Sequence, residues 1–543
     1  MIWQDTISHA GVKYKYYKSI RVFFNSIVAL MHWLFVGHFN IEYRRTLKQA
    51  ILATILIGIF SFPFVSQFFK FSLKTEHAHS IISVEQALNN FVCNKSSDIS
   101  NKYPIRSLIT GSNTSLEKWT NIPLSSIPSS LAGTNEAYCK TLVPFINNEN
   151  SLMFVMSGIF KLKPDITLEQ LTETLVFLFA FSLLFSIFVL LRLGLSPLCC
   201  FGIFYLGCAI QHYIINFGHA FSIYPFLMII LVLYTSLIAL ILDLGLHKKL
   251  WTTIVVGFLL GLIGAFILNF RTSYLPIVIL GYIMYLGFAL LDIKKKIKTT
   301  KNLLFLPIAF LGFLVIGFST FQSVFYSPIA NLTVNFNRAY HVIGHSLVLG
   351  LAVPENELSR RENIKWEDIT GDNLAKKIDP KAKYLGANYE KALLTYYMKL
   401  WIYYPQEMLD IYINKWMFSV VPLKSFISAT FNVPPNWFIS LVSIPLYIIE
   451  NGIIYSLILG LLAIFALLKW NHWNIGFAFF ISMLASASFL LVFETAIINP
   501  GFSLIYQNSL LLAIFIFSLC FYQWGINLAA KSTKMFLMRW DKC

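Results

Sequence analysis

Residues 252–270 read TTIVVGFLLGLIGAFILNF, an apolar run without a charged side chain. A helix that crosses a bilayer needs about 20 mostly apolar residues, and this run has that length. The whole chain has the same character, because it is 57% hydrophobic and only 13% charged. Soluble domains are about one quarter charged. The sequence therefore predicts an all-α polytopic membrane protein.

Further runs of this kind predict about ten transmembrane helices and two long outer loops, each forming a small helical subdomain. The runs are 49–69, 169–193, 196–217, 220–246, 252–270, 273–293, 303–324, 451–469, 474–494 and 504–527. They divide the chain into a cytoplasmic N-terminal segment (1–48), a first span (49–69), a first outer loop (70–168), a central transmembrane block (169–324), a second outer helical domain (325–450) and a C-terminal transmembrane block with a cytoplasmic tail (451–543).

The orientation follows from lysine and arginine, which are in excess in cytoplasmic loops. All the basic clusters fall on one side if both termini are cytoplasmic. The formal charge of +16 thus reflects topology and predicts no nucleic-acid partner. The clusters are Arg44, Arg45 and Lys48; Lys248 and Lys249; Lys294, Lys295, Lys296, Lys298 and Lys301; and Lys531, Lys534 and Arg539.

Residues 20–39, IRVFFNSIVALMHWLFVGHF, form a short run that contains Asn25 and His32. As a span, this run would place the basic residues between Lys13 and Arg21 outside. An amphipathic helix in the cytoplasmic interface fits the pattern better. The run has no small-residue cleavage site, so it does not resemble a removable signal peptide.

The seven cysteines fall into different settings. Cys93 and Cys139 share the first outer loop, where an oxidising compartment would allow them to pair or to stay free. Four others lie in or beside apolar spans, where a packed, inert thiol is usual. They are Cys199, Cys200, Cys208 and Cys520.

The predicted spans keep their ionisable residues near their ends. Arg192, Asp243 and Asp292 lie near cytoplasmic ends, and Arg271 and Glu494 lie near outer ends. Transporters usually carry such residues in mid-span and often contain repeated halves, so a pump or channel is disfavoured. The chain also has no phosphate-binding Walker loop or dinucleotide fingerprint. The energy for a reaction would therefore arrive in the substrate.

Two acidic residues of the first outer loop are candidate general bases. Glu76 follows the first span closely, and Glu136 lies in the stretch GTNEAYCKTL. A carboxylate at the membrane surface can deprotonate an acceptor hydroxyl that attacks a lipid-borne electrophile. The alternative for each is a solvated acidic side chain on a loop.

Arg271 lies in the stretch LNFRTSYLP at the outer end of the predicted fifth span. Arginine can bind phosphate through two parallel hydrogen bonds. An interfacial arginine that reaches lipid headgroups is the equal alternative.

The stretch NRAYHVIGHSLVLGL, residues 337–351, follows the predicted seventh span on the outer side. In a helix, His341 and His345 would share one face. A zinc site would need further ligands, and Val342 replaces the glutamate of an HExxH motif, so metal is the least favoured role. Arg338, His341 and His345 therefore form either a substrate or phosphate contact or a helix packed at the interface. We predict no metal or other cofactor.

The rest of the second outer loop is rich in charges and aromatic residues. Helical spacing over 388–417 predicts a small helical subdomain with an apolar and aromatic stripe. The stripe consists of Tyr389, Leu393, Tyr396, Tyr397 and Leu400. The charged residues of the irregular part are either solvated surface or contacts to a polar substrate. They are Arg360, Arg361, Lys365, Asp368 and Asp372.

This layout resembles the GT-C superfamily of membrane glycosyltransferases, in particular its protein-mannosyltransferase and lipid A aminoarabinose transferase branch. The likeness consists of one span, a long outer loop with an acidic residue near the membrane, a block of spans and a second outer domain. It covers most of the chain in topology. The stretch RAYHVIGHSLVLGL also resembles bacterial members of the group.

The resemblance implies transfer of a sugar from a polyprenyl-phosphate donor to a lipid, glycan or protein acceptor at the outer face of a bacterial inner membrane. It implies Glu76, or Glu136 behind it, as the base and Arg271 as a phosphate ligand. The family usually carries aspartate, often as an Asp-Glu or Asp-Asp pair, where this chain has Thr75-Glu76-His77. The alternatives are an O-antigen-type polymerase or ligase, which resembles this chain less in its first loop, and a non-enzymatic translocator of lipid-linked glycans.

Overall fold

The structure is a computed structural model of the chain. The residues that it describes are 45–69, 84, 87–88, 91–92, 97–98, 122–127, 133–134, 143–144, 150–215, 224–270, 274–296, 301–326, 343–384, 386–419, 451–469, 474–498, 512–520, 522–523 and 525–527. The predicted interfacial helix at 20–39 and the pair Cys93 and Cys139 lie outside these residues.

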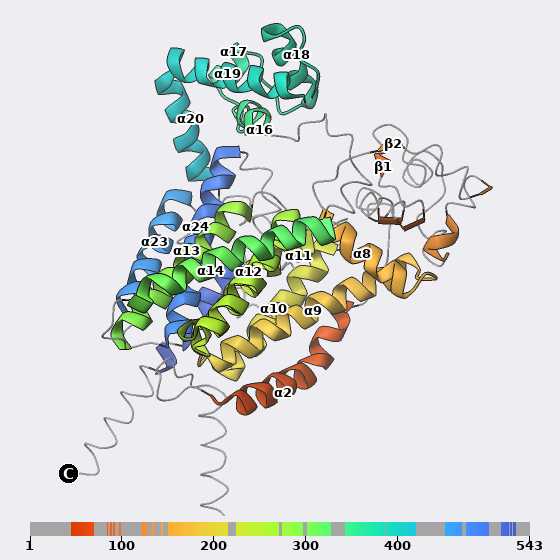
Figure 1. Cartoon of the computed structure of the whole chain (residues 1–543). Coiled ribbons are helices and arrows are strands. Elements are labelled where there is room, and N and C mark those ends of the chain that lie inside the picture. The colour runs from red at the N-terminus through yellow and green to blue at the C-terminus, as the bar shows by residue number, and fades with distance from the viewer. Residues whose placement is uncertain are drawn as a thin grey trace, which may run out of the picture.

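A bundle of apolar helices forms the larger part of the described chain (Figure 1). Its helices are α2 (Leu47–Val65), α8 (Asn150–Leu162), α9 (Leu168–Arg192), α10 (Pro197–Ile214), α11 (Tyr224–Asp243), α12 (Leu250–Phe270), α13 (Leu275–Lys296), α14 (Lys301–Thr320), α23 (Gly452–Lys469) and α24 (Ile475–Ile498). A last helical segment covers most of residues 512–527. In the first predicted loop, strand β1 (Ser97–Asp98) pairs antiparallel with β2 (Val143–Pro144).

Six helical segments in the described residues are long and apolar enough to cross a membrane. They are Leu47–Phe69, Leu168–Arg192, Leu250–Phe270, Leu275–Asp292, Phe305–Val324 and Ile475–Glu494. Four shorter apolar helices, Pro197–His212, Ile229–Asp243, Gly452–Ile464 and Leu512–Asn527, fall on the other predicted spans. The chain is thus a helical, multi-pass membrane protein, as predicted. The number ten stays a prediction.

Helices α2 and α9 each begin at a threonine that stands directly before an apolar run. Thr46 and Thr167 each form a capping box, with Gln49 and Gln170 respectively. Each box satisfies two of the backbone N–H groups that a helix start leaves without an internal acceptor.

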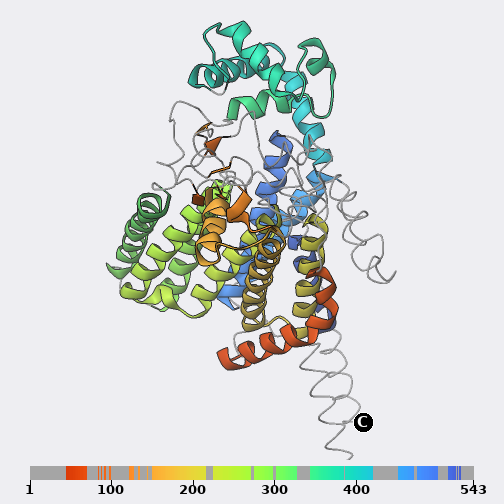
Figure 2. The same ribbon diagram turned by 90° about the vertical axis from the view of Figure 1, so that its right-hand side faces the viewer.

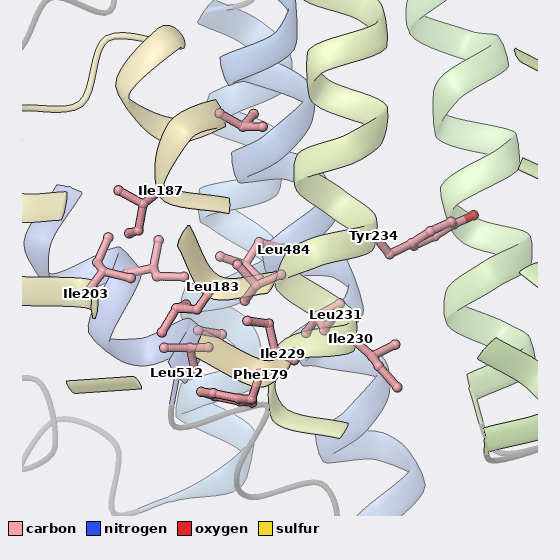
Figure 3. Close-up of a cluster of buried hydrophobic side chains, with 14 of the residues drawn as sticks. Phe179, Leu183, Ile187, Ile203, Ile229, Ile230, Leu231, Tyr234, Leu484 and Leu512 are labelled. Carbon is pink, nitrogen blue, oxygen red and sulfur yellow. The ribbon is translucent and has the colours of Figure 1, made fainter. Parts of the chain in front are cut away.

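The centre of the bundle is closely packed and apolar. Figure 3 shows Phe179 and Leu183 of α9 facing Leu231 of α11 and Leu484 of α24, all fully buried. Tyr234 of α11 points away from this group, and its hydroxyl donates to a backbone carbonyl of α13 at 3.0 Å. This packing leaves the buried cysteines Cys199, Cys200 and Cys208 as free thiols, as predicted, while Cys520 is half-buried.

Helices α12 and α14 approach each other at glycines. A Cβ atom on Gly261 would lie 2.2 Å from the Leu314 carbonyl oxygen, and one on Gly317 would lie 2.1 Å from the Phe258 carbonyl oxygen. Small residues allow such backbone contact, which is a common basis of helix association in membranes. The backbones of α12 and α14 therefore lie in close contact at these glycines.

At one end of the bundle, polar residues connect the ends of neighbouring helices. Arg192, at the end of α9, donates to Asp243 of α11 at 2.8 Å, and Asp243 also accepts from Asn474, which precedes α24. Arg45, which precedes α2, donates to the Leu191 carbonyl at 3.0 Å. We name Arg45, Arg192, Asp243 and Asn474 the polar end layer. Since starts and ends of helices meet here, α2 and α24 run opposite to α9 and α11.

A second domain consists of α16 (Ile343–Gly350), α17 (Glu357–Arg361), α18 (Asp368–Ile378), α19 (Ala387–Tyr403) and α20 (Pro405–Phe418). Its helices pack around a hydrophobic cluster that includes Tyr389, Leu393 and Leu400 of the predicted stripe. The predicted helical stretch is divided at Tyr404. In both views this α16–α20 domain stands beyond one end of the bundle (Figures 1 and 2).

Candidate functional site

His345 is the one predicted site residue among the described residues. It lies near the start of α16 and is 5% exposed. Its Nδ1 lies 2.6 Å from the Tyr389 hydroxyl oxygen, and its Nε2 lies 3.4 Å from Asp368 Oδ1. The imidazole is thus held between a hydroxyl of α19 and a carboxylate of α18. The Tyr389 contact is the closer of the two, and the Asp368 side chain is 67% exposed.

Two tyrosines enclose the ring. Tyr384 meets the rings of Tyr389 and His345 edge-on, at centroid distances of 5.4 and 6.5 Å. Burial raises the pKa of both tyrosines, and a hydrogen bond to Asp368 raises the pKa of Tyr384 further. Both hydroxyls therefore stay protonated at neutral pH, and Tyr389 can act as a donor or acceptor toward His345.

The start of α16 is held by a second residue of α19. Glu390 Oε1 accepts a hydrogen bond from the backbone N–H of Gly344 at 2.5 Å. A carboxylate is favourable at a helix N-terminus, where N–H groups lack internal acceptors. Glu390 and its neighbour Tyr389 thus hold two consecutive residues of α16.

Two carboxylate oxygens in this region are buried and accept no hydrogen bond from the described chain. They are Glu390 Oε2 and Asp372 Oδ1. The other oxygen of Asp372 pairs with Lys376 at 2.6 Å. Within the described residues, no group of three or more His, Cys, Asp or Glu side chains has a metal-binding arrangement.

The other predicted site residues lie outside the described residues. They are Glu76, Glu136, Arg271, Arg338 and His341. Their contacts to His345 therefore stay predictions. Arg338 and His341 come shortly before α16 in the chain, so only their connection to that helix is fixed by sequence.

Lys415 is a buried residue that sequence reasoning missed. It is fully buried, and its amine donates to the Ile497 carbonyl in the last turn of α24 at 2.9 Å. Burial lowers the pKa of Lys415 to about 7. The sequence contained a signal for this burial. Met408, Ile411 and Lys415 follow helical spacing, and they share the buried face of α20.

The next residue, Trp416, connects α20 to α23. Its indole N–H donates to the Ser456 hydroxyl at 3.0 Å, and its ring meets Phe489 and Phe493 of α24 edge-on. Through these two residues, α20 joins the α16–α20 domain to the end of α24 that lies opposite the polar end layer.

Comparisons with protein-family models, with curated proteins and with solved structures find no match to this chain.

Proposed function

We propose that this chain is a glycosyltransferase, which moves a sugar from a polyprenyl-phosphate donor to a lipid, glycan or protein acceptor at the outer face of a bacterial inner membrane. The observation that carries the proposal is the unequal character of the two bundle ends. One end is joined by the short polar contacts of Arg192, Asp243 and Asn474, whereas the folded α16–α20 domain stands at the other. A reaction on a membrane-bound substrate needs protein mass on the face where it occurs.

The proposed topology has ten spans and two cytoplasmic termini. It places the polar end layer on the cytoplasmic side and the α16–α20 domain outside. The described basic residues support this orientation, because Arg45 belongs to the polar end layer, Lys48 lies in the first turn of α2, and Lys248 and Lys249 follow the end of α11.

Glu76 is the proposed base, with Glu136 as the alternative. In the proposed reaction, the base takes the proton of the acceptor hydroxyl while that oxygen attacks the sugar and the carrier phosphate leaves. Arg271, Arg338 and His341 are the proposed contacts to this phosphate, since basic groups stabilise its negative charge. His345 was the fourth predicted contact. Both of its ring nitrogens face protein groups, so the proposal does not depend on it.

The test is incubation of the purified full chain, in lipid nanodiscs, with a panel of polyprenyl-phosphate sugars. We expect release of the free polyprenyl phosphate from at least one donor, measured by mass spectrometry. Glu76→Gln is the matched control, because it removes the proposed base and keeps the side-chain shape. Absence of release from every donor in the wild type would count against the proposal.

A translocator of lipid-linked glycans is the second candidate. It is favoured by six buried hydroxyl groups of the bundle that have no hydrogen-bond partner in the described residues. Four of them, those of Thr235, Ser236, Ser482 and Ser488, lie on the neighbouring helices α11 and α24. A polar route between these helices would use such groups. Movement of a fluorescent lipid-linked glycan across the bilayer of proteoliposomes, without cleavage, would support this candidate over the enzyme.

A further inference from the structure

We propose that His345 is a positioning residue. Together with Asp368, Tyr389 and Glu390 it fixes the first turn of α16 on α18 and α19, and this turn directly follows residues 337–342 in the chain. These four residues are named the α16 clamp. The inference rests on the proposed function only in taking the donor phosphate as the ligand of Arg338 and His341.

The burial of His345 argues against direct contact with a substrate. The ring is 5% exposed and Tyr389 is 1% exposed. If the imidazole turned toward a ligand, it would lose the 2.6 Å contact and leave the Tyr389 hydroxyl buried without this partner. An unsatisfied buried hydroxyl is more costly than the average hydrogen bond is favourable. The ring is therefore held in place.

The clamp acts on the first turn of α16 from two sides. Tyr389 and Glu390 hold His345 and Gly344 from α19, and Asp368 faces His345 from α18. A Cβ atom on Gly344 would lie 3.0 Å from Glu390 Oε1 and from Leu394 Cγ, so glycine allows the close approach of α19. These contacts concentrate on the residues that directly follow the proposed phosphate-binding segment.

Helix α16 also contacts α24. The α16–α20 domain thus contacts α24 in two places, through α16 and through Lys415 of α20. The clamp sets the position of the first of these contacts. If the clamp loosens, we expect the start of α16 to open while the hydrophobic cluster around Leu393 and Leu400 stays intact.

Hydrogen–deuterium exchange of the full chain in nanodiscs tests the clamp without an activity assay. In Tyr389→Phe, we expect the amides of α16 to exchange about five-fold faster, which corresponds to the loss of one hydrogen bond. Peptides from α17 and α20 should keep the wild-type rates. Thr395→Ala is the matched control, because the Thr395 hydroxyl is on the exposed side of α19 and bonds to the Lys391 carbonyl of its own helix. Unchanged exchange in α16, or faster exchange throughout the domain, would overturn the proposal.

A second measurement compares His345→Gln with His345→Ala. The glutamine amide can donate to Asp368 and accept from Tyr389, so a positioning role allows rescue by glutamine. We expect His345→Ala to raise KM for the donor with little change in kcat, and His345→Gln to stay close to the wild type. If both variants lose activity equally while α16 exchanges normally, the imidazole itself contacts substrate and the proposal fails. If the wild type turns over no donor, the proposed function fails, and the exchange experiment alone decides on the clamp.

Discussion

Lys415 places an amine in a fully buried position between α20 and α24. Burial disfavours the charged form and lowers the pKa to about 7, from 10.5 for a solvated lysine. Between these two values the unfolded state binds more protons than the folded state, so the free energy of unfolding rises with pH. We expect the thermal unfolding midpoint of the purified protein to rise from about pH 7 to about pH 9.

Lys415→Met separates this residue from other titrating groups. Methionine keeps a long apolar side chain and cannot bind a proton, so we expect the midpoint to depend less on pH over the same range. Lys399→Met changes an exposed lysine of α19 and should keep the wild-type slope. Equal slopes in the two variants would assign the pH dependence to other residues.

Glu76 is the residue on which the proposed reaction depends. Glutamine keeps the shape and hydrogen bonding of the side chain but cannot accept the proton of an acceptor hydroxyl. We expect turnover of the responsive donor to fall on the order of 10²–10⁴-fold in Glu76→Gln. An unchanged unfolding midpoint should show that the variant is folded. Full activity would instead direct the search to Glu136→Gln.

The candidate site could be predicted from the sequence only in part. Tyr389 was predicted to lie in an apolar and aromatic stripe, and it is buried. Its hydroxyl contact to His345 joins residues 44 positions apart, and helical spacing within one segment cannot reveal a partner on another. Asp368 was predicted as solvated surface or a substrate contact, and its side chain is 67% exposed. Its 3.4 Å contact to the imidazole of His345 could not be predicted, for the same reason.

At the scale of the helices, the close contact between α12 and α14 requires glycine at position 261, which can be tested. A Cβ atom at position 261 would lie 2.2 Å from the Leu314 carbonyl oxygen, so the two backbones would have to move apart. We expect Gly261→Ala to be destabilising by about 1–3 kcal/mol, as for other overpacked positions. A lower thermal unfolding midpoint in nanodiscs would show this effect.

Gly312→Ala is the matched control, because Gly312 lies in α14 and a Cβ atom there would meet nothing within 4 Å. Its midpoint should equal or exceed that of the wild type, since alanine favours helix more than glycine does. A drop as large as that of Gly261→Ala would mean that glycine is needed for reasons other than close packing.

The helices themselves could largely be predicted from the sequence. Each predicted span contains helical residues in the part that the structure describes, because the length of an apolar run is a local property. Which helices contact one another was harder to predict from the sequence. Arg192 and Asp243 were predicted near cytoplasmic ends, but their pairing across 51 residues depends on how α9 and α11 pack.

For the whole molecule, the polar end layer and the α16–α20 domain occupy opposite ends of α24. Asn474 precedes this helix and bonds to Asp243, whereas Ile497 in its last turn accepts from Lys415. If α24 crosses the membrane, these two ends face different compartments. If one end of α24 faces the cytoplasm together with the basic loops, the other end and the α16–α20 domain must therefore face outside.

Cysteine labelling tests this orientation in intact cells. The background for it is a chain in which Cys93, Cys139 and Cys543 are replaced by serine. We expect an impermeant thiol reagent to label Ser112→Cys in the first loop and Asn373→Cys, an exposed position of α18, because both are predicted to lie outside. Thr299→Cys lies among the lysines between the predicted sixth and seventh spans, and it should react only after the cells are opened. Labelling of Thr299→Cys in intact cells, without labelling of Asn373→Cys, would reverse the topology. The α16–α20 domain would then face the cytoplasm, where a reaction with an outer-leaflet donor could not take place.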